Sequence, residues 1–238
     1  MAKIIGITGL AGVGKDTFAR AMQRRFTAIG KNARLAGFAD SIRDISLSVG
    51  LNPYKREEKE TRKLLVWSVF IDALFDAIED TLGTLMDDND RALLWTYTVE
   101  AIEPRMFDDA GTSYISISPR EFMQILGTEG GQRVRKTLWV DVAMRAWKDA
   151  TEAGRAVIVT DFRFAHEAAS LDYCICINRP GTERVNGHVS EDMADTLTRR
   201  IVPDYLNKVA VSFVQNTGTQ EELEVQAAQF ANTLAVVL

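Results

Sequence analysis

Residues 3–29 constrain the fold of this chain more than any other stretch. They begin with an apolar run that predicts a β-strand over residues 3–8. Lys15 then opens a segment whose apolar residues recur at the spacing of one helix face, which predicts a helix over residues 15–29. The loop between these elements contains Gly9, Gly12, Val13 and Gly14. A strand, a glycine-rich loop, a lysine and a helix in this order are typical of a phosphate-binding loop, in which backbone N–H groups and the lysine surround a polyphosphate.

Asp16 follows the lysine at the position where the usual pattern has Ser or Thr, and Thr17 comes one place later. The hydroxyl at that position normally contacts Mg²⁺. Asp16 could hold the metal itself or through a water, because Mg²⁺ accepts one or two carboxylates beside phosphate oxygens. Alternatively, Asp16 only caps the helix, whose N-terminus favours a negative charge. The strand and helix around the loop predict phosphate binding under either interpretation.

Composition limits the partners and the compartment that we expect. The 238 residues carry a net charge of −5, which argues against a broad electrostatic hold on a nucleic-acid polymer. No stretch approaches an uncharged membrane span, and the first residues lead straight into a strand with no signal peptide. Cys174 and Cys176 would share one face of a strand, which suits buried thiols better than a disulfide. We therefore expect a soluble, cytoplasmic protein.

Five apolar runs predict the strands of one sheet. They cover residues 3–8, 33–38, 156–159, 173–177 and 209–214. Helical segments alternate with these runs, and the runs at 156–159 and 173–177 are continuously apolar, as in strands that are buried on both faces of a parallel sheet. The expected fold is a single α/β domain over residues 1–238, with the doubly wound, parallel five-stranded sheet of a P-loop NTPase.

Residues 56–103 look entirely helical and predict a helical insertion over about residues 52–115. Leu64 belongs to one apolar stripe at helical spacing in this region. The acidic turn of residues 87–90 precedes a second helical pattern. This turn could bind a cation, or one of its side chains could cap the helix that follows.

Two further helices are expected after this region. Ser118 and Glu121 form a capping box around a proline, which predicts a helix start there and an end near Gly127. A second apolar face predicts a helix over about residues 138–150.

Asp161 ends one of the buried strands, where open α/β sheets place their ligand crevice. A carboxylate beside a phosphate loop can bind Mg²⁺ directly or can orient the groups that bind it. Alternatively, it can simply cap a turn. Arg163 comes two residues later and would point into the same crevice.

Arginines are the other candidate ligands, because a kinase that phosphorylates a phosphate must offset the repulsion between two anionic groups. The guanidinium fork suits this task, since it binds two phosphate oxygens at once. Arg120 and Arg163 stand out because a capped helix start and a strand end hold them in place. The other candidates are Arg43, Arg133, Arg135, Arg179, Arg184, Arg199 and Arg200. His188 could act as an acid or base, although a positional role in a lid suits phosphoryl transfer better.

Several stretches resemble the bacteriophage deoxynucleoside monophosphate kinases. The most specific are residues 118–140 and 161–168, and residues 14–17 fit because that family commonly carries Asp after the lysine. The stretches at 38–43, 188–191 and 216–223 also fit. These matches span nearly the whole chain in islands, but they cover residues 50–115 only loosely.

The resemblance implies the fold of a nucleoside monophosphate kinase, ATP and Mg²⁺ as donor and metal, and a 2′-deoxynucleoside monophosphate as acceptor. It assigns catalysis to Lys15, Arg120 and Arg163, and the metal to Asp16 and Asp161. The implied ATP site comprises Gly9, Gly12, Val13, Gly14, Lys15, Asp16, Thr17, Arg179 and Arg184. The implied acceptor site comprises Asp40, Arg43, Gln124, Glu129, Trp139 and Asp161. Residues 181–200 would form a lid over ATP.

Two other functions stay open at this point. The strand and loop pattern is also that of other small-molecule P-loop kinases, such as those that resemble dephospho-coenzyme A kinase. A nucleotide-binding NTPase without a phosphate acceptor is a third class, although the surplus of arginines favours an acceptor. The sequence does not reveal base preference, and the apolar helical stretch at 64–82 leaves room for a homodimer. If a phage encodes the protein, it would act in the host cytoplasm.

Overall fold

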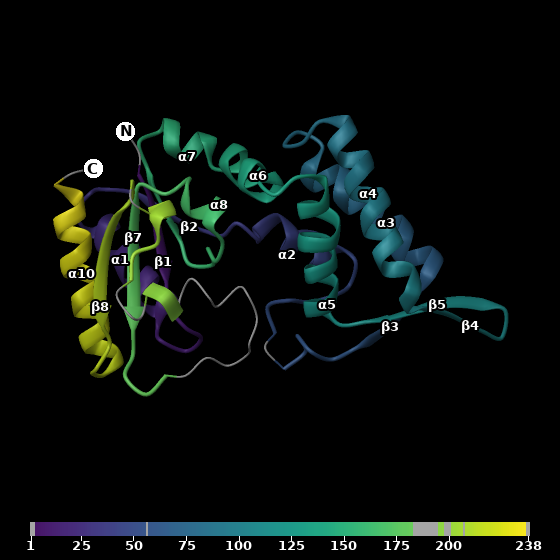
Figure 1. Cartoon of the computed structure of the whole chain (residues 1–238), viewed down its shortest axis with the longest axis horizontal. Coiled ribbons are helices and arrows are strands. Elements are labelled where there is room, and N and C mark those ends of the chain that lie inside the picture. Colours follow the sequence, from purple (N-terminus) through teal and green to yellow (C-terminus); the bar gives the residue numbers. More distant parts are fainter. Residues whose placement is uncertain (1–2, 56, 183–194, 198–200, 207, 237–238) are drawn as a thin grey trace. The chain divides into compact units, whose positions relative to one another are not determined.

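The computed structural model describes residues 3–55, 57–182, 195–197, 201–206 and 208–236 (Figure 1). The chain divides into two compact units. The first comprises Met1–Phe38 and Trp147–Leu238, and the second comprises Ala39–Ala146. The insertion expected over residues 52–115 falls within the second unit, and the bounds predicted for the domain, the insertion and the lid stay predictions.

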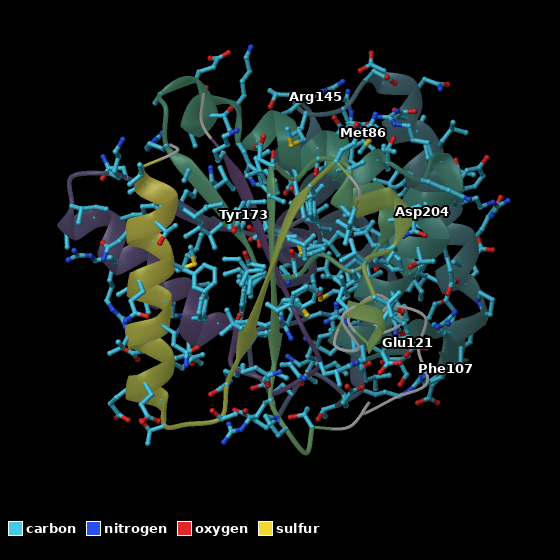
Figure 2. The ribbon with its side chains drawn as sticks, turned by 60° about the vertical axis from the view of Figure 1, so that its left-hand side comes forward. Met86, Phe107, Glu121, Arg145, Tyr173 and Asp204 are labelled. Atoms are coloured by element: carbon cyan, nitrogen blue, oxygen red, sulfur yellow. The ribbon has the colours of Figure 1, made fainter. Side chains whose placement is uncertain are left out.

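The first unit is built on a parallel five-stranded sheet, as the sequence predicts. Its strands, in spatial order, are β2 (Ala33–Ala36), β6 (Ala156–Val159), β1 (Ile4–Thr8), β7 (Tyr173–Asn178) and β8 (Ala210–Gln215). The central strand β1 pairs with β6 on one side and with β7 on the other. Tyr173, labelled in Figure 2, also joins β7 to β8, because its hydroxyl lies 2.6 Å from the Ser212 hydroxyl.

Helices cover both faces of this sheet (Figure 1). On one face, α1 (Lys15–Ala28) and α10 (Gln220–Ala235) pack together over the strands and bury Phe18, Met22 and Phe26. Burying each of these side chains contributes about 1.5–3 kcal/mol to folding. On the other face, Phe162 and Leu171 pack directly against Gly6 of β1, where a side chain would collide with both.

The described part of the first unit also contains further short helices. These are α7 (Lys148–Glu152), α8 (Ala165–Ala168) and a 3₁₀ turn at Asp204–Leu206. Cys174 and Cys176 are buried thiols rather than disulfide partners, as expected. None of the described helices is long and apolar enough to cross a membrane.

The helix predicted over residues 138–150 is wrong in one respect, because it breaks at Trp147. The break separates α6 (Leu138–Ala146) from α7. Trp147 is buried and packs on Phe38, with 5.2 Å between the ring centroids. Periodicity alone did not reveal this break, because Trp139, Ala143 and Trp147 keep helical spacing across it.

The second unit combines helices with a three-stranded antiparallel sheet of order β3-β5-β4. Its helices are α2 (Asp40–Ser48), α3 (Trp67–Leu82), α4 (Asp88–Ile102), a 3₁₀ turn at Glu103–Arg105, α5 (Pro119–Gln124), a π-helical segment (Ile125–Gln132) and α6. Its strands are β3 (Lys63–Val66), β4 (Met106–Asp109) and β5 (Thr112–Ile117). An apolar core that includes Leu74, Leu94, Ile115 and Phe122 holds the unit together.

The expectation that residues 56–103 are entirely helical is therefore wrong. Leu64, assigned to a helical stripe, lies in β3 opposite Ser116 and is 60% exposed. A short apolar run reads the same in a helix and in a strand, and only pairing with β5 decides between them.

Helix starts follow the local sequence closely. The Asp87 carboxylate accepts a hydrogen bond from the Asp90 backbone N–H at 2.8 Å, so the acidic turn caps α4. Ser118 accepts from the Glu121 N–H at 3.2 Å and starts α5, with the proline in its first turn. Both predicted helix starts are confirmed.

The predicted helix end near Gly127 is wrong, because the chain continues as the π-helical segment. Gly130 and Gly131 lie inside this segment, and a side chain on either would collide with Thr98 or with the indole of Trp139. The glycines therefore permit close packing here and do not terminate the helix.

Candidate active site

The loop between β1 and α1 has the shape that a phosphate-binding loop requires. Gly9 and Gly14 have φ values of 146° and 99°, in the region that favours glycine. A side chain at Gly9 would collide with the carbonyl oxygen of Ile177. Gly14 is the N-cap of α1, and no described side chain caps that helix. The positive end of the helix dipole therefore faces this loop.

The ammonium of Lys15 lies over the loop. Its Nζ donates hydrogen bonds to the carbonyl oxygens of Gly9 and Leu10, each at 2.8 Å. Asp16 is exposed in the first turn of α1, and Thr17 is half-buried one residue later. One lysine, one carboxylate, one hydroxyl and a curled backbone thus gather within nine consecutive residues.

Asp161 stands at the same edge of the sheet. It follows β6, which runs parallel to β1, so both strands end on the loop's side. Its Oδ1 accepts a hydrogen bond from the backbone N–H of Phe38 at 2.9 Å. Arg163 is exposed two residues further on, and Arg179 is exposed after β7, the other neighbour of β1. The first unit thus brings the loop, Asp161, Arg163 and Arg179 to one sheet edge.

Glu167 is a charged residue of this edge that sequence reasoning did not single out. Its Oε2 accepts hydrogen bonds from the backbone N–H groups of Arg163 and Phe164, at 2.5 and 2.9 Å. Burial raises the pKa of Glu167 to about 7, and these two hydrogen bonds act in the opposite direction. The available signal was its spacing, because a glutamate three residues after a helix cap returns to bond the backbone.

Asn216 is a second residue whose contact sequence reasoning did not single out, although it begins the stretch 216–223 that fits the resemblance. It follows β8 and is 4% exposed, and its side-chain amide donates to the Val13 carbonyl oxygen at 2.9 Å. No local pattern reveals this contact, since 203 positions separate the two residues.

The remaining candidates lie in the second unit, where ion pairs hold several of them. Arg43 and Asp40 share the first turns of α2, with 2.7 Å between Nη1 and Oδ1. Arg120 forms an ion pair with Glu60, and its backbone N–H donates to the Lys59 carbonyl oxygen at 3.0 Å.

Three further acceptor-site candidates differ sharply in exposure. Gln124 and Glu129 are exposed, whereas Trp139 is buried and donates its indole N–H to the Gly127 carbonyl oxygen at 3.0 Å. This burial gives Trp139 a clear structural role, and its predicted contact with substrate stays a prediction.

Two of the candidate arginines form ion pairs with acidic residues inside the second unit. Arg133 binds Glu100 at 2.8 Å and lies 3.9 Å from the centroid of the Tyr97 ring. Arg135 bonds to Asp90, and its Nε lies 3.0 Å from Asp141. Glu121, labelled in Figure 2, similarly holds Arg105 and Arg62. The predicted roles of Arg184, Arg199, Arg200 and His188 fall outside the described residues.

A parallel sheet whose first strand enters a glycine loop and a lysine-headed helix defines the class of P-loop nucleotide-binding proteins. The family model described as Deoxynucleotide monophosphate kinase matches residues 52–202, which is more than half of the chain. The chain therefore belongs to the deoxynucleotide monophosphate kinase family, and it is a phosphotransferase that uses ATP to phosphorylate deoxynucleoside monophosphates. A comparison with curated proteins found no match. The loop at residues 9–15 lies outside the matched range, so its assignment depends on its geometry.

Proposed function

We propose that the loop at residues 9–15 binds the phosphates of ATP and that Lys15 and Arg163 stabilise charge on the transferring phosphoryl group. The observation that carries the proposal is the loop itself, with glycines at positive φ, the N-terminus of α1 and the Lys15 ammonium in one place. Phosphoryl transfer needs mainly positioning and fixed positive charge, and this arrangement supplies both.

Mg²⁺ is part of the proposal, with Asp16 and Asp161 as its protein ligands. Among the described residues no group of three or more His, Cys, Asp or Glu side chains could hold a metal. This fits Mg²⁺ in a kinase, which is held by one or two carboxylates together with substrate phosphates. When bound, the ion neutralises charge on the phosphate oxygens. Asp16, exposed in the first turn of α1, and Asp161, at the same sheet edge, suit this donor set.

The acceptor site is proposed in the second unit. Arg43 and Arg120 offer the guanidinium forks that suit a monophosphate, and the Arg120 side chain is 44% exposed. Asp40 and Glu60 hold these arginines, and a phosphate would compete for the same donors. Gln124 and Glu129, both exposed, are the remaining polar candidates for contacts with the nucleoside.

We also propose a cytoplasmic homodimer. Buried reduced thiols at Cys174 and Cys176 suit a reducing compartment. Leu64, Val69 and Phe75 of the second unit are large exposed apolar side chains of the kind that subunit contacts cover. An origin in a bacteriophage stays an implication of the sequence resemblance.

The experiment that tests the proposal measures ADP formation from ATP with each candidate acceptor. We expect ADP to form with one or more deoxynucleoside monophosphates, to require Mg²⁺, and to be lost in Lys15→Ala. Activity with dephospho-coenzyme A, or ATP hydrolysis that no acceptor stimulates, would instead support one of the other two classes. Wild-type turnover by a folded Lys15→Ala protein would refute the assignment of the loop.

A further inference from the structure

The side chain of Asn216 joins the end of the sheet to the proposed phosphate loop. Its backbone N–H donates to the Asn178 carbonyl oxygen at 2.7 Å, which anchors the residue at the end of β7. Its side-chain Nδ2 donates to the Val13 carbonyl oxygen at 2.9 Å. Both Asn216 and Val13 are buried, so this hydrogen bond is shielded from solvent.

Helix α10 begins shortly after Asn216, and its start is capped. Thr219 caps the helix, and the Glu222 carboxylate returns to the Thr219 N–H at 2.8 Å. Leu223, one residue further on, packs against Gly14, since a Cβ on that glycine would lie 2.6 Å from a Leu223 methyl group. The same Cβ would lie 3.2 Å from the Asn216 amide nitrogen. The loop backbone therefore rests against the segment from Asn216 to Leu223.

The hydrogen bond determines which way one peptide group of the loop faces. In a trans peptide the C=O and the following N–H point in opposite directions. Because the Val13 carbonyl points toward buried Asn216, the N–H of Gly14 points away from it. Backbone N–H groups of such a loop are the donors that surround a polyphosphate.

We propose that Asn216 is a positioning residue for phosphoryl transfer, and that its amide holds the Val13–Gly14 peptide so that the Gly14 N–H faces the phosphates of ATP. This inference rests on the proposed role of the loop at residues 9–15. Asn216 does not touch the nucleotide in this role. It acts by keeping a backbone donor in place before ATP arrives.

Asn216→Asp is the sharpest test, because it keeps the shape of the side chain and removes the donor when ionised. Removing the donor leaves the buried Val13 carbonyl oxygen without a partner, so we expect kcat/KM for ATP at pH 8 to fall about ten- to hundredfold. The acceptor KM should change less than about threefold, because the tether acts on the donor side. Asn216→Ala removes the donor without adding a charge. This variant replaces Asn216→Asp in the same measurement if Asn216→Asp does not fold.

The pH dependence of Asn216→Asp separates positioning from a general structural role. A buried carboxyl beside a carbonyl oxygen has a raised pKa, and its protonated form can donate to Val13. The ratio of the wild-type kcat/KM to the variant kcat/KM should therefore decrease toward one as the pH falls from 8 to 6. Asn232→Asp is the matched control, since Asn232 is an exposed asparagine of α10 whose side chain accepts a hydrogen bond from Arg25 and does not touch the loop. It should show neither the loss nor the pH dependence.

Hydrogen exchange without nucleotide tests the tether itself. The amides of residues 9–17 should exchange faster in Asn216→Asp than in wild type or in Asn232→Asp. Unchanged exchange, or wild-type kcat/KM for ATP in a folded Asn216 variant at pH 8, overturns the inference. Wild-type turnover by Lys15→Ala would overturn the proposed role of the loop instead, and the exchange result would still report whether the tether exists.

Discussion

The proposed phosphate loop of the first unit and the proposed acceptor arginines of the second unit are two different ways to build an anion site. The loop is made of consecutive backbone groups, and glycine geometry at Gly9 and Gly14 determines its shape. The second unit uses separate side chains, and Asp40 and Glu60 hold Arg43 and Arg120. A backbone site can thus be recognised in one short stretch of sequence. A side-chain site depends on which partners the fold brings to each arginine.

The largest effect is expected for Lys15→Ala. A small loss of activity in this variant would contradict the comparison, because the loop would then not depend on its lysine. The loop concentrates its side-chain charge in this one residue, and its ammonium lies over the Gly9 and Leu10 carbonyl groups. We expect kcat to fall about a thousandfold with the fold intact, since fixed charge at the transferring group supplies most of the catalysis. Steady-state kinetics and circular dichroism check this. Lys31→Ala, an exposed lysine just after α1, should be indistinguishable from wild type.

The next largest effect is expected for Glu167. This residue combines features of both kinds of site, because its side chain binds backbone N–H groups. Its pKa is raised to about 7 in the folded protein from an ordinary value of 4.5, so the folded state binds the proton more tightly. The free energy of unfolding should therefore fall as the pH rises from about 4.5 to about 7. At about 1.4 kcal/mol for each pKa unit, the loss is at most about 3.5 kcal/mol.

Glu167→Gln, which mimics the protonated form, should lack this loss. Urea unfolding at several pH values checks the prediction. Glu222→Gln is the control, because Glu222 bonds the backbone at the start of α10 in the same way but is exposed. Equal pH slopes for wild type and Glu167→Gln would contradict the expected titration.

Arg120→Lys tests the side-chain site proposed in the second unit. Lysine keeps the charge but lacks the guanidinium fork, so the acceptor KM should rise about tenfold while the ATP KM moves less than about twofold. Initial-rate measurements with each substrate varied in turn check this. Arg62→Lys is the control, since Arg62 is also exposed and also paired with a glutamate of this unit. Equal KM values for wild type and Arg120→Lys would place the acceptor phosphate elsewhere.

Asp16→Asn has the smallest expected effect and separates the two interpretations of this residue. A metal ligand should lose affinity when its charge is removed, so the Mg²⁺ concentration for half-maximal rate should rise about threefold. Because Gly14 is the N-cap of α1, the other interpretation is that the Asp16 charge only favours the helix N-terminus, and its removal would then leave this concentration unchanged. The control is Asp149→Asn, in the first turn of α7, which should change nothing in the same titration.

Local sequence predicted the parts of this protein that depend on near neighbours. The five parallel strands, the glycine loop, the capped starts of α4 and α5 and the buried thiols were all predicted correctly. Each depends on interactions within a few residues or on an apolar run long enough to be unambiguous. The functional class could also be predicted from the sequence, because the loop, the stretch around Ser118 and the stretch around Asp161 are each continuous in sequence.

Tertiary structure alone decided the rest. Strand β3 exists because β5 pairs with it, and the helix predicted at residues 138–150 is interrupted at Trp147, which is buried. The π-helical segment continues past Gly127, and within it Gly130 packs against Thr98 and Gly131 against Trp139. The hydrogen bond from Asn216 to Val13 and the burial of Glu167 likewise arise between distant residues. Periodicity and capping report only local free energies, whereas these features depend on contacts that form when the chain has folded.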